Sequence, residues 1–429
     1  YPAISDYNIA IGLNSKYVDA YYNRAYTYRL MGKYKMALRD FNKVIELNPN
    51  DLESYINKGE IFKDIGEYKE AEDEFSESIS LDSNYTEIYF NRGYCKYRLK
   101  KHEEAILDYT KSIELNPNYA NTYNNRGVSK MNLKDYEEAI ADYNKAIKLD
   151  SNETDFYYNR ALSKVKLNDN NGAIADYNKV IELEPNNKAY NNRGLLKKGL
   201  KDFEGAMKDL TTSIELSPTT FFQYFNRAQL KGSIKDFEGA VKDYTMAIFY
   251  NNNYVDAFIA RAASKVELND FKDAIEDCSK AIELDSSISL AFNQRALSKV
   301  KLNDNKGAIA DYNKAIELEP GLAKSYVNRG VSKYYLKDYK GAIADYNKAI
   351  SLNPDNAMAY NGRGNVKLDL KDYKGAIKDY TKAIELNLDD AISYNNRGLS
   401  KYYLNQDYCP DFKKACELGN CENYNKGCK

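Results

Sequence analysis

An arginine recurs every 34 residues along this chain, and this period constrains the fold more than any other feature of the sequence. The series consists of Arg24, Arg92, Arg126, Arg160, Arg193, Arg227, Arg261, Arg295, Arg329, Arg363 and Arg397. One step is 33 residues, between Arg160 and Arg193, and Lys58 fills the single gap. A fixed period of this size is typical of stacked repeat arrays, which work through the extended surface that they present. Twelve such repeats leave little of the 429 residues for a catalytic domain.

Charge and composition argue against several classes of function. The 62 basic and 63 acidic side chains are interleaved, so no basic field favours nucleic acid or an anionic membrane. No segment approaches the roughly 18 consecutive apolar residues of a membrane span. The only histidine, His102, stands where other repeats carry Tyr136 or Phe203, so we expect it to pack. Without a second histidine, the usual base-assisted and histidine–metal arrangements cannot form. We therefore predict no catalytic residue, no metal site, no cofactor and no enzymatic activity.

One repeat, residues 120–153, shows the pattern of a helical hairpin. Tyr123, Gly127 and Leu133 lie on one side of a helix, and the small Gly127 lets another backbone come close. A short turn at 134–136 follows. A second amphipathic helix is indicated by steps of three and four residues between Ala139, Ile140, Tyr143, Ala146, Ile147 and Leu149. A single hairpin cannot bury both of its apolar faces, so we expect the hairpins to stack.

This pattern resembles the tetratricopeptide repeat, a family of 34-residue helix-turn-helix units. An aromatic residue occupies the family's first-helix tryptophan position in all twelve repeats, as at Tyr21, Tyr55, Phe258 and Tyr394. The family's small residues and closing proline recur at Gly59, Gly93, Ala161, Gly330, Ala37, Ala71, Ala105, Ala376, Pro49, Pro117, Pro185, Pro218, Pro320 and Pro354. The periodic arginine replaces a frequent leucine, and a lysine replaces a later aromatic in ten repeats. The resemblance implies an all-α fold, a right-handed α-solenoid (superhelix) of about twelve helix-turn-helix repeats.

The repeats suggest a simple domain organisation. Residues 1–17 match the second half of a repeat, so we interpret them as the second-helix remnant of a truncated repeat. Residues 18–387 hold eleven tandem repeats, and residues 388–429 hold a twelfth, irregular repeat with a cysteine-rich cap. Because the start falls inside a repeat, the lack of a targeting segment is uninformative.

Each periodic arginine is followed by an acid, usually 16 residues later, on the second helix. We predict structural ion pairs between Arg92 and Asp108, Arg126 and Asp142, and Arg329 and Asp345. In the second repeat both members change, to Lys58 and Glu74, which suggests contact between them. A lysine one turn after each arginine would support the same acid. The alternative interpretation is an anion-binding ladder of arginines.

The residue before the arginine lies on a different face of the first helix and is asparagine in nine of twelve repeats. In the tetratricopeptide repeat family the first helices line a concave groove, and asparagine at this place can bind the backbone of an extended peptide. A carboxamide suits that role because it offers both a donor and an acceptor. The alternative is that duplication simply copied the residue. The candidates are Asn23, Asn57, Asn91, Asn125, Asn159, Asn192, Asn226, Asn328 and Asn396.

Variable neighbours on that face would supply specificity. Tyr22, Tyr26, Phe90 and Tyr94 make the first third aromatic, and the acids Asp19, Glu53 and Glu87 lie beside them. This combination favours a peptide with apolar anchors and some Lys or Arg. Alternatively, the aromatic residues only pack between repeats.

One block of the array occurs twice. Residues 160–185 and 295–320 differ at only two of 26 positions, whereas the residues just upstream have diverged. The scaffold was copied while part of the groove changed, which fits a binding array better than a catalytic one.

Four of the six cysteines fall in the last 21 residues, at Cys409, Cys416, Cys421 and Cys428. Their spacing departs from that of usual zinc sites, so two disulfides that staple the terminal repeat are the preferred interpretation. Residues 414–419 also resemble the cysteine-bearing hairpins of Sel1-like repeats, whose secreted members are disulfide-bonded. Both points favour an extracytoplasmic location, periplasmic or secreted, over the cytoplasm. Cys95 and Cys278 stand alone and are expected to pack.

Taken with the resemblance, these features predict a protein–protein interaction scaffold or adaptor that binds an extended peptide or partner protein in its groove. Two alternatives stay open: a structural array that associates with its own copies, and the targeting arm of a larger enzyme. The sequence does not name the partner.

Overall fold

A computed structural model describes residues 2–428, and the contacts divide these residues into two units. Unit 1 ends at Leu216 and unit 2 begins at Ser217. Unit 1 contains α1 (Pro2–Leu13), α2 (Val18–Leu30), α3 (Tyr34–Leu47), α4 (Leu52–Ile65), α5 (Tyr68–Leu81), α6 (Thr86–Arg98), α7 (His102–Leu115), α8 (Ala120–Asn132), α9 (Tyr136–Leu149), α10 (Thr154–Lys166), α11 (Asn170–Leu183), α12 (Asn187–Gly199) and α13 (Phe203–Leu216). Unit 2 contains α14 (Phe221–Ser233), α15 (Phe237–Tyr250), α16 (Val255–Glu267), α17 (Phe271–Leu284), α18 (Ser289–Lys301), α19 (Asn305–Leu318), α20 (Ala323–Tyr335), α21 (Tyr339–Leu352), α22 (Ala357–Asp369), α23 (Tyr373–Leu386), α24 (Ala391–Tyr403), α25 (Cys409–Glu417) and α26 (Glu422–Gly427).

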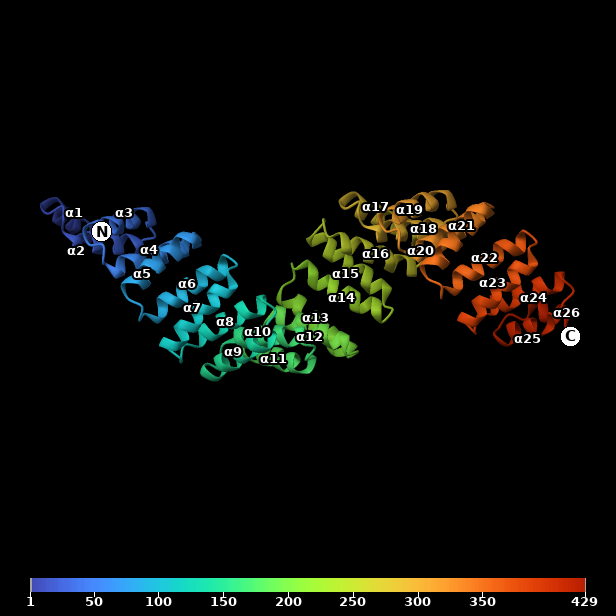
Figure 1. Cartoon of the computed structure of the whole chain (residues 1–429), viewed down its shortest axis with the longest axis horizontal. Coiled ribbons are helices and arrows are strands. Elements are labelled where there is room, and N and C mark those ends of the chain that lie inside the picture. The colour runs from blue at the N-terminus through green and yellow to red at the C-terminus, as the bar shows by residue number, and fades with distance from the viewer. Residues whose placement is uncertain (1, 429) are drawn as a thin grey trace. The chain divides into compact units, whose positions relative to one another are not determined.

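Within each unit, consecutive helices form hairpins that follow one another along the chain (Figure 1). The even-numbered helices from α2 to α24 are the first helices of the hairpins, and the odd-numbered helices from α3 to α25 are the second helices. Strands do not occur in residues 2–428. The predicted all-α solenoid of helix-turn-helix repeats is therefore confirmed.

The turn inside a hairpin has a recurring backbone geometry. At the end of α8, Lys134 adopts a left-handed conformation with φ of +67°. The amide of Asp135 then donates to the carbonyl of Lys130 at 3.0 Å, and the amide of Lys134 donates to that of Met131 at 3.0 Å. These two bonds satisfy carbonyls that the helix end leaves open, as in a Schellman motif. The same left-handed position is glycine only at Gly32 and Gly66 in the first two hairpins.

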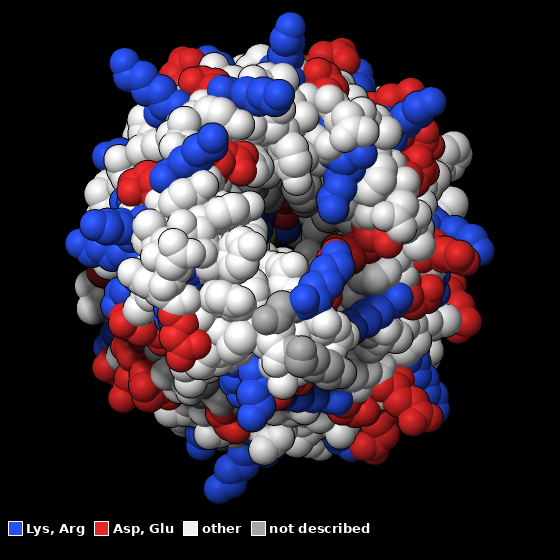
Figure 2. Space-filling model, turned by 90° about the vertical axis from the view of Figure 1, so that its right-hand side faces the viewer, with Lys and Arg blue, Asp and Glu red and all other residues white. Residues whose placement is uncertain are grey.

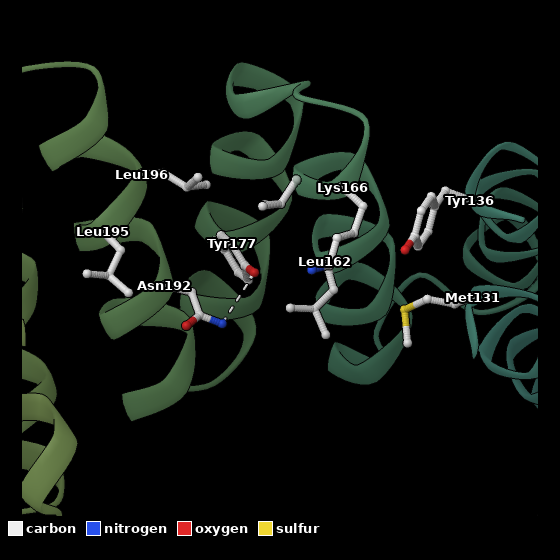
Figure 3. A pocket seen from close by; sticks show the side chains of 9 residues that line it. Met131, Tyr136, Leu162, Lys166, Tyr177, Asn192, Leu195 and Leu196 are labelled. Carbon is white, nitrogen blue, oxygen red and sulfur yellow. Dashed lines mark hydrogen bonds between the residues drawn. The ribbon is translucent and has the colours of Figure 1, made fainter. Parts of the chain in front are cut away.

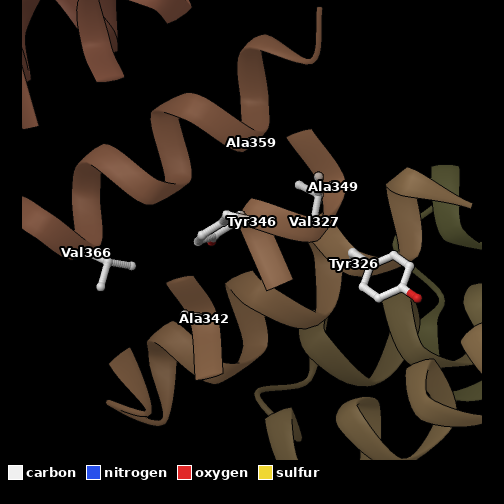
Figure 4. Close-up of a cluster of buried hydrophobic side chains, with 7 residues drawn as sticks. All are labelled: Tyr326, Val327, Ala342, Tyr346, Ala349, Ala359 and Val366. Carbon is white, nitrogen blue, oxygen red and sulfur yellow. The ribbon is translucent and has the colours of Figure 1, made fainter. Parts of the chain in front are cut away.

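The core of each hairpin forms where a small residue meets an aromatic ring. A Cβ atom added to Gly127 would lie 2.7 Å from Cε1 of Tyr143, which is fully buried on α9. This explains why the first helix requires a small residue there, as the sequence indicated. In unit 2, residues of α20, α21 and α22 meet around the buried ring of Tyr346, so the core continues from one hairpin into the next (Figure 4).

The first helices form an inner layer within each unit. Successive first helices contact one another from α2 through α4, α6 and α8 to α10, and from α14 through α16, α18, α20 and α22 to α24. Among the described residues, second helices of successive hairpins show no comparable contacts. The first helices are therefore closer together than the second helices, which makes their exposed side the concave side of each unit. We call this side the inner face.

The C-terminal end is closed by α25 and α26. Disulfides join Cys409 to Cys428 and Cys416 to Cys421, so all four clustered cysteines are paired. Cys95 and Cys278 are free and buried, and burial raises the pKa of each thiol to about 12. None of the helices in residues 2–428 has the length and apolar character that crossing a membrane would require.

Candidate functional site

The periodic arginine lies between helices, where its guanidinium group is held by three side chains. Nε and Nη2 of Arg126 donate to Asp142 at 2.9 and 2.6 Å, and Nη1 donates to Oγ1 of Thr110 at 3.1 Å. Nζ of Lys130 approaches the same carboxylate at 2.9 Å. The guanidinium carbon also lies 5.7 Å from the ring centroid of Tyr123.

The same geometry recurs along the array. Arg92 bonds Asp108 and Ser76, and Arg329 bonds Asp345 and Asn313. Lys58 and Glu74 form the corresponding pair of the second repeat, at 2.6 Å. Because these internal partners occupy the guanidinium donors, the geometry favours a structural pair over an anion-binding ladder.

Sequence reasoning missed the partner in the preceding repeat. The side chain 16 residues before Arg126 belongs to α7, so the bond joins two successive hairpins. The sequence does contain a signal for this partner, because the position equivalent to Thr110 carries a side chain with an oxygen atom before every periodic Arg or Lys. It is occupied by Asn8, Asn42, Ser76, Thr110, Asn144, Asn178, Thr211, Thr245, Ser279, Asn313, Asn347 and Thr381.

The nine candidate asparagines all lie on first helices, but their exposure differs. Asn23 is exposed, Asn57 is buried, and Asn91, Asn125, Asn159, Asn192, Asn226, Asn328 and Asn396 are half-buried. Several bond a side chain of the preceding hairpin. Nδ2 of Asn159 donates to Asn124 at 3.0 Å, and Nδ2 of Asn192 donates to the Tyr158 hydroxyl at 3.1 Å. The carboxamides thus connect neighbouring first helices.

Asn57 and Asn91 accept from cations of the preceding repeat. Arg29 donates to Oδ1 of Asn57, and Lys63 donates to Oδ1 of Asn91 at 3.0 Å. Asn57 also donates to the carbonyl of Glu53 at 2.7 Å. Since both ends of the buried Asn57 carboxamide are bonded internally, it is a poor candidate for holding a ligand backbone.

An N-terminal hollow of about 370 Å³ lies on the inner face of α2, α4 and α6. Tyr22 and Tyr26 line it, with their rings stacked at a centroid distance of 6.5 Å. Glu53 and Glu87 line it too, and neither forms an ion pair with another described residue. Burial and the nearby Glu53 carboxylate raise the pKa of Tyr22.

The other two predicted aromatic residues do not line this hollow. Phe90 packs against Tyr109 and Tyr119, with centroid distances of 6.0 and 5.2 Å. Tyr94 packs against Tyr68 at 6.2 Å and accepts a hydrogen bond from Arg98 at 2.8 Å. The four aromatics therefore divide into a pair that lines the hollow and a pair that packs within the array.

A second hollow of about 410 Å³ lies further along unit 1, and Figure 3 shows its lining. Leu162, Val165 and Leu195 form aliphatic walls, and the Tyr177 hydroxyl lies within 3.4 Å of Nδ2 of Asn192. Unit 2 carries hollows of about 440 and 380 Å³ on its own first helices, lined among others by Asn328 and by Asn361. Asn192 and Asn328 belong to the predicted ladder, and sequence analysis also places Tyr334 and Tyr335 on this face, where they line the unit 2 hollows. Sequence reasoning missed the aliphatic walls, although aliphatic residues two positions after several arginines were a signal.

Charge on the surface is mixed. In the view of Figure 2, basic and acidic side chains alternate, and neither sign covers a continuous region.

Among residues 2–428 there is no group of three or more His, Cys, Asp or Glu side chains placed to hold a metal ion. His102 packs against Tyr97 at a centroid distance of 5.5 Å.

Comparison with known proteins identifies the hairpins. Profiles described as tetratricopeptide repeat match residues 18–51, 86–119, 120–153, 323–356 and 357–390, residues 154–187, 188–220 and 290–321, and residues 41–73. No curated protein sequence matches the chain with significance.

Solved structures resemble the fold. Yeast Tom70 is 19% identical, with 91% of this chain and 97% of that chain covered and a TM-score of 0.41. A chain of the APC/C hetero-tetramer Cut9–Hcn1 is 14% identical, with 96% of each chain covered and a TM-score of 0.49. YrrB, described as a TPR protein with an unusual peptide-binding site, is 20% identical, with 43% of this chain and 96% of that chain covered and a TM-score of 0.38.

The residues between the matched ranges continue the same architecture. Helices α14 to α17 span 221–284 as two further hairpins, and Arg227 and Arg261 bond Asp243 and Asp277 there. Since the matched ranges together cover more than half of the 429 residues, the chain belongs to the tetratricopeptide repeat family.

Proposed function

We propose that this protein is an interaction scaffold that holds an extended segment of a partner protein against its inner face. One observation carries the proposal: the inner face of each unit is hollowed between successive first helices, and asparagines of the predicted ladder lie in these hollows. Asn91 lines the N-terminal hollow, Asn192 the second hollow of unit 1, and Asn328 the hollow of about 440 Å³ in unit 2. Concave sites with apolar walls and a few polar groups are the usual form of a binding site.

The bonding of the asparagines limits which of them can serve a ligand. Asn159 uses Nδ2 to bond Asn124, and its Oδ1 has no hydrogen-bond partner among the described residues. A carboxamide oxygen has two lone pairs, so Asn159 can still accept from a peptide N–H. Asn57 is excluded by its internal bonds, so the ladder would bind through the less buried asparagines.

The N-terminal hollow indicates one part of the partner's chemistry. Glu53 and Glu87 lack ion-pair partners among residues 2–428, and Tyr22 and Tyr26 offer aromatic faces beside them. Carboxylates and aromatic rings both attract a cation. A Lys or Arg side chain of the partner segment fits this place.

The experiment uses the full chain as bait for a library of displayed random dodecapeptides. Asn125→Ala/Asn159→Ala/Asn192→Ala removes ladder carboxamides from the inner face. Glu114→Ala/Lys148→Ala/Glu182→Ala is the matched control, because these exposed residues lie on second helices. Peptides retained by wild type and by the control but lost by the inner-face variant are expected. Equal retention by a folded inner-face variant, checked by circular dichroism, contradicts the proposal.

A further inference from the structure

Two of the hollows, one in each unit, are lined by residues of the same types at equivalent positions. Leu162, Val165, Lys166 and Tyr177 line the hollow of about 410 Å³ in unit 1. Leu297, Val300, Lys301 and Tyr312 line the hollow of about 440 Å³ in unit 2. Each of the four pairs is separated by the same number of residues, because both sets belong to the block that occurs twice in the chain. We call these two sites the Leu162 hollow and the Leu297 hollow.

The match extends to side chains outside the copied block. Asn192 and Leu195 on α12 complete the Leu162 hollow, and Asn328 and Val331 on α20 complete the Leu297 hollow. The sequences of α12 and α20 have otherwise diverged, for example where Lys198 and Gly199 correspond to Tyr334 and Tyr335. The remaining lining differs, with Met131, Tyr136 and Leu196 at the Leu162 hollow and Asn303, Asn305 and Tyr335 at the Leu297 hollow. The shared positions are therefore the part of each hollow that suits the same ligand.

The floor of each hollow is closed by a tyrosine and an asparagine. Nδ2 of Asn192 lies 3.4 Å from the Tyr177 hydroxyl, and the equivalent residues Asn328 and Tyr312 both line the Leu297 hollow. In unit 1, aliphatic walls beside this floor are available to a ligand. Leu162 and Leu195 form them (Figure 3), and Val165 also lines the hollow. A large apolar side chain would bury its surface there, and removing apolar surface from water favours binding.

A lysine side chain without an ion-pair partner among residues 2–428 lies at the rim of each hollow. Lys166 ends α10 and Lys301 ends α18, both are exposed, and neither forms an ion pair with another residue in 2–428. Most other lysines of the first helices are held by the carboxylate of their own repeat, as Lys164 is by Asp176 at 2.8 Å. A ligand that places an apolar side chain in the hollow would complement Lys166 or Lys301 if it carried a carboxylate next to that side chain.

We propose that the Leu162 and Leu297 hollows bind the same short motif, an apolar side chain next to an Asp or Glu, so that one chain holds two copies of it. The proposal rests on the proposed function, since it assigns a ligand class to part of the inner face. Two equal sites would let the array gather two partner molecules, or hold one partner that carries the motif twice with higher avidity.

Isothermal titration of the full chain with a blocked heptapeptide, Ser-Gly-Ala-Leu-Asp-Gly-Ser, tests the proposal. Wild type is expected to bind two peptides per chain. Lys166→Glu and Lys301→Glu should each weaken one site about threefold to tenfold, because an exposed attraction becomes a repulsion. The double variant should weaken both sites. The same peptide with Lys in place of Asp should regain binding to the double variant, which a merely structural role of the lysines would not produce.

Lys306→Glu is the matched control. Lys306 is also exposed and lies in the copied block, but it does not line the Leu297 hollow, so two sites should remain. A stoichiometry of one, or binding that both charge reversals leave unchanged, overturns the proposal. Absence of heptapeptide binding, while the library still yields peptides lost by the inner-face asparagine variant, refutes this inference and leaves the proposed function standing.

A second copy of the chain is the competing occupant of the hollows. Sedimentation of wild type and of the Lys166→Glu/Lys301→Glu variant distinguishes it. A wild-type dimer that becomes monomeric in the variant overturns the proposed motif in favour of self-association. A monomer in both cases is the result expected here.

Discussion

Arg126 donates a hydrogen bond to Thr110 of the preceding hairpin at 3.1 Å while it holds Asp142 of its own hairpin at 2.6 and 2.9 Å. One guanidinium group therefore ties α7, α8 and α9 together. In a repeat array each unit contacts only its neighbours, so stability depends on such nearest-neighbour contacts. The recurrence of this bond gives the array a regular polar connection beside its apolar core.

We expect Asp142→Ala to lower the free energy of unfolding by about 3–5 kcal/mol, because Arg126 and Lys130 would remain half-buried without their carboxylate. Thr110→Val should cost only about 1–2 kcal/mol, since it removes one bond to a charged group. Urea unfolding followed by circular dichroism measures both. Replacing the ion pair by Arg126→Met/Asp142→Leu should be much less harmful than Asp142→Ala, and a larger loss in the double variant would contradict this account.

The left-handed turn residues offer a test of backbone strain. Lys134 has φ of +67°, a conformation that costs a non-glycine residue roughly 1–2 kcal/mol. We expect Lys134→Gly to raise the midpoint of thermal unfolding, with part of the gain offset by the greater freedom of glycine in the unfolded chain. Gly66 has φ of +86°, so the reciprocal change Gly66→Lys should lower the midpoint of thermal unfolding. Shifts of the same sign in the two variants would refute the explanation.

The disulfides should stabilise the C-terminal cap to different extents. Cys409 and Cys428 are separated by 19 residues, whereas Cys416 and Cys421 are separated by five. Loop-closure entropy predicts about 3 kcal/mol for the longer loop and about 2 kcal/mol for the shorter one. Limited proteolysis of the native protein should therefore cleave Cys409→Ser/Cys428→Ser faster than Cys416→Ser/Cys421→Ser. The reverse order would show that loop length does not govern the cap.

Alkaline pH should destabilise the array through its buried tyrosines. Burial raises the pKa of Tyr177 and of Tyr244 to about 12, against 10.0 in the absence of burial. Between these values the unfolded chain loses the phenolic proton while the folded chain keeps it, so stability falls as pH rises. Each such tyrosine contributes about 1.4 kcal/mol per pH unit to the loss.

Thermal unfolding at a series of pH values above about 9 measures the effect of the buried tyrosines. Tyr177→Phe removes one of these protons and should make the decline shallower, even if it lowers stability at neutral pH. A midpoint that stays constant up to about pH 11.5 would contradict the prediction.

Much of the site prediction depended on positions that the period itself reveals. The ion pair of Arg92 with Asp108 follows from spacing, because a hairpin of two regular helices brings those positions together. Tyr22 and Tyr26, which the sequence suggested as groove residues, line the N-terminal hollow. Phe90 and Tyr94 have the same chemistry and the same kind of position, yet they contact Tyr109, Tyr119 and Tyr68 instead. Only the neighbouring repeats explain that difference.

The sequence by itself determined the hairpin, its turn and its stacking, because these depend on local helix periodicity and on small and aromatic residues repeated in every unit. The tertiary structure decided which inner-face groups stay available to a ligand. Asn57 and Asn159 occupy the same place in their repeats, but Arg29 occupies Oδ1 of Asn57, whereas Oδ1 of Asn159 has no hydrogen-bond partner among residues 2–428. The physical reason is that a hollow forms between two repeats, so its open donors and acceptors depend on side chains about one period apart that pack only after the hairpins have stacked.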